Sequence, residues 1–532
     1  MTRPATPTWR HLASAVLAAA ALTVGCAPAT DSPAAGPPGA APEATPAAPR
    51  TATTPVPDDR LVVALPADVA GFDPRAQRAF RDITLHGVIL EPLLSLSHDF
   101  ALVPRLAIGW DVTDEGHTVT FRLREGVTFH DGRAFTAEDV RFTFEAILAS
   151  ADATARSALT PVTSIETPDA HTVVLRIDDP TRGVLIGLAS VPILPAGSWD
   201  EVDARPIGTG PFSFARRDVG TALFVERFEA YWGDASDVPA VEFRVIADAG
   251  DRTRALIRGT AHLSQSQWSA EQERSLDGDR NVRFVRTHDV SYQYLGINPA
   301  RPPFDDLDVR HALNHLVPRE RIVADVLGGR AFPAASLLVP SMPWFDPATP
   351  AYAYDVDRAR ALIDGSASTP FERTYTIITN VNPIREGIAE VLTASFAQVG
   401  MRVEVEVLDF STYLDRVYGR DFDMYLLGLA GAYNVGNLLA GHVSETGLYN
   451  RYGFSDPEAE AMLREAVSGD PSSPDAVALF REVANRLVAY SAQAFLYHGV
   501  VTGASRADVE GWNPHPVPDL AYQDLHLVHL GP

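Results

Sequence analysis

Lysine is absent from this sequence: all 44 basic residues are arginines, and they are outnumbered by 68 acidic residues. The formal net charge of −24 becomes −26 once residues 1–25 are removed, because that stretch holds two arginines and no acid. Such an acidic surface argues against nucleic acid and against electrostatic attachment to anionic lipid. It mildly favours neutral or cationic ligands, although an acidic exported protein without such a preference would carry the same charge. We expect no nucleic-acid partner.

Cysteine occurs once, at Cys26, which excludes a disulfide within the chain and a cysteine-ligated metal site. An apolar run over residues 12–24 follows two arginines and is too short to span a membrane stably, which predicts a secretory signal peptide over residues 1–25. Residues 22–26 (LTVGC) resemble a bacterial lipobox, in which the cysteine becomes the lipidated first residue, although Thr23 stands where leucine is usual. The alternative is an ordinary signal peptide with an incidental cysteine. We expect contact with the membrane through this lipid anchor only.

Signatures of catalysis are also missing. The sequence has no G-x-S-x-G, no H-E-x-x-H and no catalytic cysteine, so we expect no enzyme; an exported hydrolase is the less favoured alternative. Residues 206–212 (PIGTGPF) lack the third glycine and the Lys-Ser/Thr of a phosphate-binding loop. His311 and His315 lie one helical turn apart, a spacing that can bind zinc or nickel, but no third ligand is nearby. We therefore expect solvated histidines, no metal and no cofactor.

The chain is too long for one ordinary core, and 532 residues suggest two or three lobes. Residues 26–58 consist mainly of alanine, proline, threonine, serine and glycine. Such a segment cannot bury enough surface to offset its chain entropy, so we expect a disordered tether. Its length suits an anchored protein that must reach a membrane partner.

Residues 106–148 (LAIGWDVTDEGHTVTFRLREGVTFHDGRAFTAEDVRFTFEAIL) show the clearest local pattern. Apolar and polar residues alternate over residues 119–123 and again over 127–129, which predicts two short strands, and Asp131-Gly132 is a tight-turn dipeptide. Thr136 is placed as the N-cap of a helix with acidic residues in its first turn and one apolar face. The pattern predicts a β-hairpin docked on an amphipathic helix.

Residues 375–407 predict a strand, a helix and a second strand, with Gly400 at the end of the helix. In such units a ligand tends to lie beyond the carboxyl ends of the strands, near the helix N-terminus. Asn380, Asn382 and Arg385 occupy that turn. Arg385 is the best candidate to bind an anionic group, although an ordinary surface arginine is the default interpretation.

Residues 106–148 also resemble the signature of the solute-binding proteins of family 5, the oligopeptide, dipeptide and nickel binding proteins of ABC importers. The matching motifs are F-x-L-R-x-G-V-x-F-H-D-G and T-A-x-D-V. Weaker matches at residues 206–212, 292–298 and 303–314 extend the resemblance over about residues 60–530. It implies an α/β fold of the periplasmic binding protein type (class II, Venus-flytrap), with two large lobes and an extra smaller domain.

The resemblance also divides the chain. Beyond the signal peptide (residues 1–25) and the lipid-anchored tether (26–58), it implies three parts: lobe I (59–97, 206–290 and 498–532), domain II (98–205) and lobe III (291–497).

The function implied is that of an extracytoplasmic solute-binding lipoprotein. It would be a monomer on the periplasmic or cell-surface side of the cytoplasmic membrane, and it would capture a small solute or a peptide by hinge closure. Its second partner would be the ABC permease that receives the solute. A ligand-sensing receptor not coupled to transport is an alternative that would have the same sequence features.

By the same resemblance, several segments are expected to face the ligand. For Trp268, packing under a loop is an equally good interpretation. The candidate ligand-binding residues are Phe72, His86, Gln267, Trp268, Tyr292, Tyr294, Asn298, Arg385, Tyr433 and Asn434.

The sequence departs from the family in one loop. Peptide-binding members carry G-W-x-A-D, whose aspartate holds the α-amino group of the peptide, whereas residues 428–432 read GLAGA, with Ala432 at the aspartate position. Tyr433, Asn434 and Asn437 offer hydrogen bonds and stacking instead, unless the loop only packs. A neutral or amino-blocked ligand is therefore expected to be preferred over a peptide with a free amino group.

Overall fold

The computed structural model describes residues 60–69, 71–76, 86–151, 153, 155–180, 183–349, 352–366 and 371–531. The predicted signal peptide, Cys26 and the tether lie outside these residues. Within them, no helix combines the length and the apolar character needed to cross a bilayer. The division into lobe I, domain II and lobe III remains a prediction, and the three names are used below for those parts of the chain.

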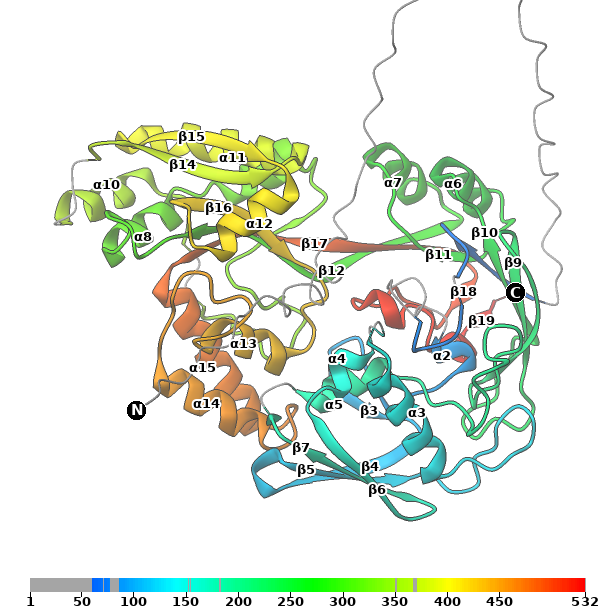
Figure 1. Ribbon diagram of the computed structural model, residues 1–532. Helices are drawn as coiled ribbons and strands as arrows, with labels where there is room; N and C mark the ends of the chain where they lie inside the picture. The colour runs from blue at the N-terminus through cyan, green and yellow to red at the C-terminus, as the bar shows by residue number, and fades with distance from the viewer. Residues whose placement is uncertain are drawn as a thin grey trace, which may run out of the picture.

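One large sheet of eleven strands runs through both lobes, in the order β15-β14-β16-β12-β17-β11-β1-β10-β9-β8, with β13 paired to β17 (Figure 1). On the lobe I side its strands are β1 (Leu61–Leu65), β8 (Phe212–Asp218), β9 (Ala222–Arg227), β10 (Ala240–Val245) and β11 (Leu263–Gln265). β1 lies between β10 and β11 in this sheet. It pairs in parallel with β10 and β11 and all five of its residues are buried, which explains its uninterrupted apolar sequence.

Two long antiparallel strands, β12 (Val282–Ile297) and β17 (Gln493–Arg506), connect the two sides of the sheet (Figure 1). Their pairing shifts register between the pairs His288–Val500 and Tyr292–His498. Three residues of β12 thus oppose the single residue Gly499 of β17. This arrangement is a β-bulge, and it bends β12 locally. The two lobes are joined through this irregular stretch.

The lobe III side of the sheet contains β14 (Thr374–Asn380), β15 (Arg402–Leu408), β16 (Met424–Leu429) and the short β13 (Phe332–Pro333). The predicted strand–helix–strand unit is confirmed: β14 and β15 are parallel, and α11 (Pro383–Phe396) connects them. Gly400 follows the helix with a φ of 80°, a left-handed conformation that glycine adopts without strain.

Domain II contains a separate four-stranded sheet in the order β4-β5-β7-β6. Its strands are β4 (Ala107–Thr113), β5 (Thr118–Leu123), β6 (Val162–Asp169) and β7 (Thr172–Ile177). The helix predicted after Thr136 is α3 (Ala137–Ala149), and the carboxylate of Asp139 accepts a hydrogen bond of 2.8 Å from the N–H of Thr136, a capping contact.

The predicted hairpin between residues 119–123 and 127–129 is wrong. β5 pairs on both sides with β4 and β7, so residues 127–129 have no free strand edge to join. They form a tight loop instead, closed by an isolated bridge between Thr128 and Ala134. Gly132, with a φ of 86°, makes the turn that the Asp-Gly dipeptide predicted.

Three helices of lobe III, α13 (Val435–Val443), α14 (Pro457–Val467) and α15 (Pro474–Tyr490), lie beside domain II (Figure 1). One apolar cluster runs from domain II through α13–α15 to Val517 and Leu520 near the C-terminus. The other helices and strands are α2 (His86–Ile89), β2 (Leu94–Leu96), β3 (Leu102–Pro104), α4 (Arg156–Leu159), α5 (Val184–Gly187), α6 (Ala249–Ile257), α7 (Ala270–Asp277), α8 (Leu307–His315), α9 (Arg319–Arg321), α10 (Val356–Gly365), α12 (Phe410–Tyr418), β18 (Val509–Glu510) and β19 (His529–Leu530). Among the short helical turns are η3 (Leu188–Ser190) and η6 (Pro518–Leu520).

Candidate functional site

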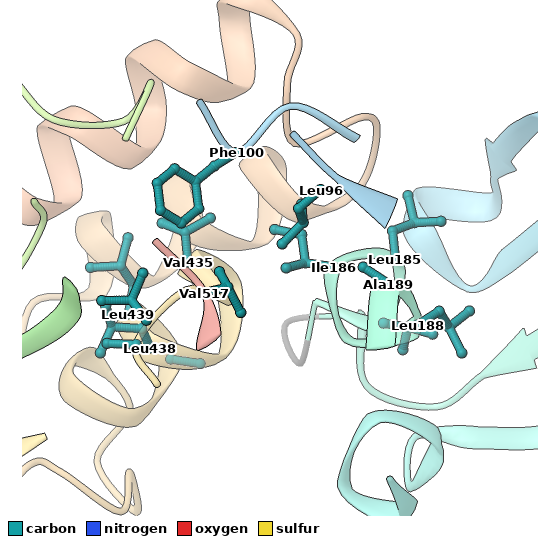
Figure 2. Packing of buried hydrophobic residues seen from close by; sticks show 14 of the residues in the cluster. Leu96, Phe100, Leu185, Ile186, Leu188, Ala189, Val435, Leu438, Leu439 and Val517 are labelled. Carbon is teal, nitrogen blue, oxygen red and sulfur yellow. The ribbon is translucent and has the colours of Figure 1, made fainter. Parts of the chain in front are cut away.

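The three parts of the chain meet at one place, which we call the junction: η3 of domain II, residues 432–435 of lobe III, and residues 517–520 of lobe I. Figure 2 shows Ile186 of α5, Val435 of α13 and Val517 of the C-terminal segment in this region, and all three belong to one buried cluster. Because no single lobe supplies the junction, a relative movement of the lobes would change it.

Tyr433 and Asn434 carry the lobe III side of the junction. Asn434 is the N-cap of α13, and its Nδ2 donates a hydrogen bond of 2.9 Å to the carbonyl of Gly183 in domain II. The phenol of Tyr433 has a hydrogen bond with Ser190 of η3, and burial raises its pKa above the ordinary value. Two of the predicted ligand residues therefore connect lobe III to domain II.

Ala432, which stands at the family's aspartate position, is only 5% exposed. Its N–H donates a hydrogen bond of 2.7 Å to the carbonyl of Val290, inside the bulge of β12. The loop is thus fixed to the irregular stretch that joins the lobes.

On the lobe I side of the junction lies Asp519, a residue that the sequence did not single out. Its side chain is buried, with 3% of the residue exposed, and its Oδ1 has no hydrogen-bond partner in the part of the chain that the structure describes. Burial raises the pKa of this carboxyl from 3.8 to about 8, and its charge contributes to the raised pKa of Tyr433. Pro518-Asp519-Leu520 is an ordinary turn sequence, which explains why no pattern pointed to it.

Tyr292 and Tyr294 extend from β12 into a buried cluster of aromatic side chains. The hydroxyl of Tyr292 lies 2.8 Å from Nε2 of His442 on α13, and Nδ1 of the same ring lies 2.8 Å from the hydroxyl of Tyr452. Burial lowers the pKa of His442 to about 3, so the ring is neutral at physiological pH and one of its nitrogens must accept a hydrogen bond. This network ties the strand that crosses between the lobes to α13.

Arg385 lies in the first turn of α11, as the β-α-β pattern predicted, and only 4% of the residue is exposed. Its guanidinium donates to Oδ1 of Asn380 and, at 3.4 Å, to Oε1 of Gln293 on β12. Both partners are neutral amides, so its charge has no counter-charge among these contacts. An anionic group remains a reasonable ligand for this arginine.

Four other candidates lie away from the junction. Phe72 packs edge-on against Phe214 in the lobe I core. Trp268 is buried against Phe284, and its neighbour Gln267 is exposed. Asn298 donates hydrogen bonds of 2.9 and 3.1 Å to two backbone carbonyls of lobe III.

His86 begins α2, and its side chain lies outside the described part of the structure. The assignment of all ten residues to ligand binding stays a prediction; the structure brings Tyr433 and Asn434 together at the junction and leaves Phe72 and Trp268 in separate cores.

An apolar pocket lies between the sheet of domain II and α13–α15. The room that it offers to a bound group is only about 30 Å³, enough for little more than water. The described residues that line it include Val112, Val119, Ile177, Ile186 and Phe480, and none of the ten predicted ligand residues is among them. A pocket of this size is too small to hold a solute, so it is not a candidate ligand site.

His311 and His315 are held by backbone groups. Nε2 of His311 lies 3.2 Å from the carbonyl of Ala489, and Nδ1 of His315 lies 2.9 Å from the carbonyl of Ala353. Within the described ranges, no cluster of three or more histidine, cysteine, aspartate or glutamate side chains could hold a metal ion.

Comparison with known proteins decides the class of this chain. Residues 101–445 match the model of the bacterial extracellular solute-binding proteins, family 5. The chain belongs to this family. The match covers most of domain II, the crossing strand β12 and the loop with Tyr433, so the junction lies largely inside the shared region.

Individual family members resemble the chain over most of its length. It is 24% identical to the dipeptide-binding protein of Escherichia coli (strain K12) over 413 residues, which cover 68% of this chain and 74% of the relative. It is 26% identical to the heme-binding protein A of Haemophilus influenzae over 411 residues, covering 68% and 73%. Relatives with different ligands match almost equally well, so similarity alone does not select a ligand.

Solved structures agree on the fold. HbpA2 from Haemophilus parasuis covers 89% of this chain and 100% of its own, with a TM-score of 0.81 at 21% identity. The unliganded open form of the periplasmic murein tripeptide binding protein MppA covers 89% and 97%, with a TM-score of 0.79 at 19% identity. The predicted α/β fold of the periplasmic binding protein type is thereby confirmed.

Proposed function

We propose that this protein captures a small solute, peptide-like in chemistry, between lobes I and III and presents it to an ABC permease. Membership of the family establishes the general activity, the capture of a solute outside the cytoplasm for an importer. The peptide-like ligand is our proposal. It is supported by the names of relatives, a dipeptide-binding protein and a di/tripeptide-binding protein among them.

The observation that supports capture by closure is the way the lobes are joined. Among the described strands of the large sheet, β12 and β17 are the two that cross between the lobes, and their pairing is interrupted by the bulge opposite Gly499. An irregular two-stranded connection can absorb changes of φ and ψ while the sheets on either side stay rigid. The residues of the junction lie near this connection, through the contact of Ala432 with Val290.

We further propose that the mature protein is monomeric and anchored by a lipid on Cys26. The support comes from the sequence: the lipobox-like residues 22–26 and the tether that follows them. An anchored tether of this kind would keep the binding protein near its permease and raise their effective concentration.

The test of this function is whether the protein purified from its own host retains a solute. Denaturing the purified protein and analysing the released small molecules by mass spectrometry should identify one dominant compound in stoichiometric amount. That compound should rebind and raise the melting temperature by mass action. If no added or retained solute of any class raises the melting temperature, solute capture is contradicted.

A further inference from the structure

The junction contains a carboxyl group whose Oδ1 has no hydrogen-bond partner among the described residues. Asp519 is 97% buried by relative surface area, since only 3% of the residue is exposed, and its Oδ1 has no hydrogen bond. A buried carboxylate is costly to keep unless a cation or several donors compensate it. Other buried acids of this protein follow that rule. Glu91 accepts hydrogen bonds from Trp232, Tyr231 and Thr209.

The position of Asp519 at the junction bears on ligand binding. Asp519 comes from the C-terminal segment of lobe I, while its neighbour Tyr433 comes from lobe III and contacts Ser190 of domain II. Asp519 therefore lies where all three parts of the chain converge. Burial is the cause of its raised pKa and no arginine lowers it, so a cationic group of a ligand would displace no existing ion pair here.

We infer that Asp519 binds the ammonium group of the solute, supplying from lobe I the negative charge that the loop at Ala432 lacks. The inference rests on the proposed function and narrows its ligand to one that carries a free amino group. It reverses the expectation, drawn from Ala432 alone, that a neutral or amino-blocked ligand is preferred.

The chemistry favours an organic cation. A single carboxylate offers too few ligands for a metal ion, and the described residues hold no cluster of three or more metal-binding side chains. An ammonium group needs only one charge-assisted hydrogen bond plus neutral acceptors, and the hydroxyl of Tyr433 and the carbonyl groups of the same loop are of that kind. The net charge of −24 would attract a cationic ligand toward the protein.

The experiment uses the full-length protein and an equimolar tripeptide library, offered together with its N-acetylated copy. Peptides retained after gel filtration are identified by mass spectrometry, and the best of them are titrated calorimetrically. We expect retention of free-amino peptides only, and a weakening of their binding by roughly ten- to hundredfold in Asp519→Asn. Glu510→Gln, an exposed residue in the same C-terminal region, makes the same change of net charge and should bind like the wild type.

The outcomes separate the two proposals. Retention of acetylated peptides as well as free ones, or unchanged affinity in Asp519→Asn, overturns the role of Asp519 while solute capture stands. The protein could also retain no peptide and instead rebind a different solute released from the native protein. That result overturns the role of Asp519 if the solute has no ammonium group. If the solute has one, the role of Asp519 stands only when Asp519→Asn weakens its binding. The comparison of free and acetylated peptides on the wild type needs no variant, so it remains valid even if Asp519→Asn does not fold.

Discussion

The hydroxyl of Tyr292 lies 2.8 Å from Nε2 of His442, so the strand that crosses between the lobes is bonded directly to α13 beside domain II. Both residues are buried, and the same imidazole reaches Tyr452 through its other nitrogen at 2.8 Å. A hydrogen-bonded chain of this kind fixes the orientation of α13, whose N-terminal residues belong to the junction. Tyr292 therefore has an architectural role, whether or not it also contacts a solute.

Removal of the Tyr292 hydroxyl should cost stability. Tyr292→Phe leaves a ring nitrogen of His442 buried without a partner, which typically costs about 1–3 kcal/mol. Urea denaturation followed by circular dichroism would measure the loss as a lower midpoint. Tyr354→Phe is the control: its hydroxyl accepts a hydrogen bond of 2.7 Å from the exposed side chain of Gln398 and a longer one of 3.4 Å from Ser395, and the residue is 41% exposed. Because water can replace the lost acceptor, the loss should be smaller, within about 1 kcal/mol of the wild type. Equal stability of Tyr292→Phe and wild type would contradict this role.

The bulge of β12 depends on the missing side chain of Gly499. A Cβ at this position would lie 2.5 Å from Oγ of Ser291 and 3.0 Å from Oδ2 of Asp289, so the Ser291 side chain must move and that of Asp289 must give way. We expect Gly499→Ala to distort the connection between the lobes, with a loss of stability of about 1–3 kcal/mol and weaker solute binding. Gly365→Ala, where a Cβ would meet nothing within 4 Å, is the control and should be neutral or slightly stabilising. Two variants of equal stability and affinity would show that the bulge tolerates a side chain.

Acid should destabilise the protein between pH 6.5 and about 4. Burial lowers the pKa of five histidines below the ordinary 6.5: His442 to about 3, and His130, His262, His498 and His515 to about 4. The unfolded chain binds protons at these sites at a higher pH than the folded chain does. Their stabilising contribution is therefore complete above pH 6.5 and is lost as the pH falls, with each pKa unit equivalent to about 1.4 kcal/mol. Urea midpoints measured at pH 7.5, 6 and 5 should decrease in that order.

Asp519 changes stability with pH in the opposite direction to the buried histidines, so it provides an internal control. Its folded pKa of about 8 lies above the ordinary 3.8, so its effect on stability is favourable at low pH and is lost as the pH rises toward 8. In Asp519→Asn this opposing contribution disappears. The gain in stability of that variant between pH 5 and pH 8 should therefore exceed the gain of the wild type. A wild-type midpoint that rises with acid would mean that the histidines are not buried in their neutral form.

The sequence predicted the fold well wherever a hydrophobic period was long or a family motif was present. α3 and α11 lie where their patterns predicted a helix, because three or more apolar residues on one face define a helix. The three residues at 127–129 were too few to distinguish a strand from a loop, and pairing partners distant in the sequence decided the outcome.

The candidate site was harder to predict than the fold. Trp268 lies among polar residues in the sequence, yet it is buried against Phe284, which is close to it only after folding. Asp519 lies in an ordinary turn sequence and was not singled out. What makes it notable is its burial and its proximity to Tyr433, which is 86 residues earlier in the sequence. A sequence pattern records spacing along the chain, whereas a site at the junction of three parts of the chain is defined by tertiary contacts.

Cys26 provides the test of membrane attachment. Lipidation requires its thiol, so Cys26→Ser should move the protein from the membrane fraction to the soluble exported fraction. Metabolic labelling with a radioactive fatty acid should mark the wild type and not the variant, because the chain has no other cysteine. Partitioning of the variant with the membrane to the same extent as the wild type would count against a lipid anchor.

Small-angle X-ray scattering with and without solute tests the central claim, capture by closure, most directly. The solute would be the compound released from the native protein, or the tripeptide that binds best, at a concentration that saturates the site. Closure of the lobes about β12 and β17 predicts a smaller radius of gyration and a shorter maximum dimension in the bound state. Tight binding, established by calorimetry on the same sample, with superimposable scattering curves would contradict it.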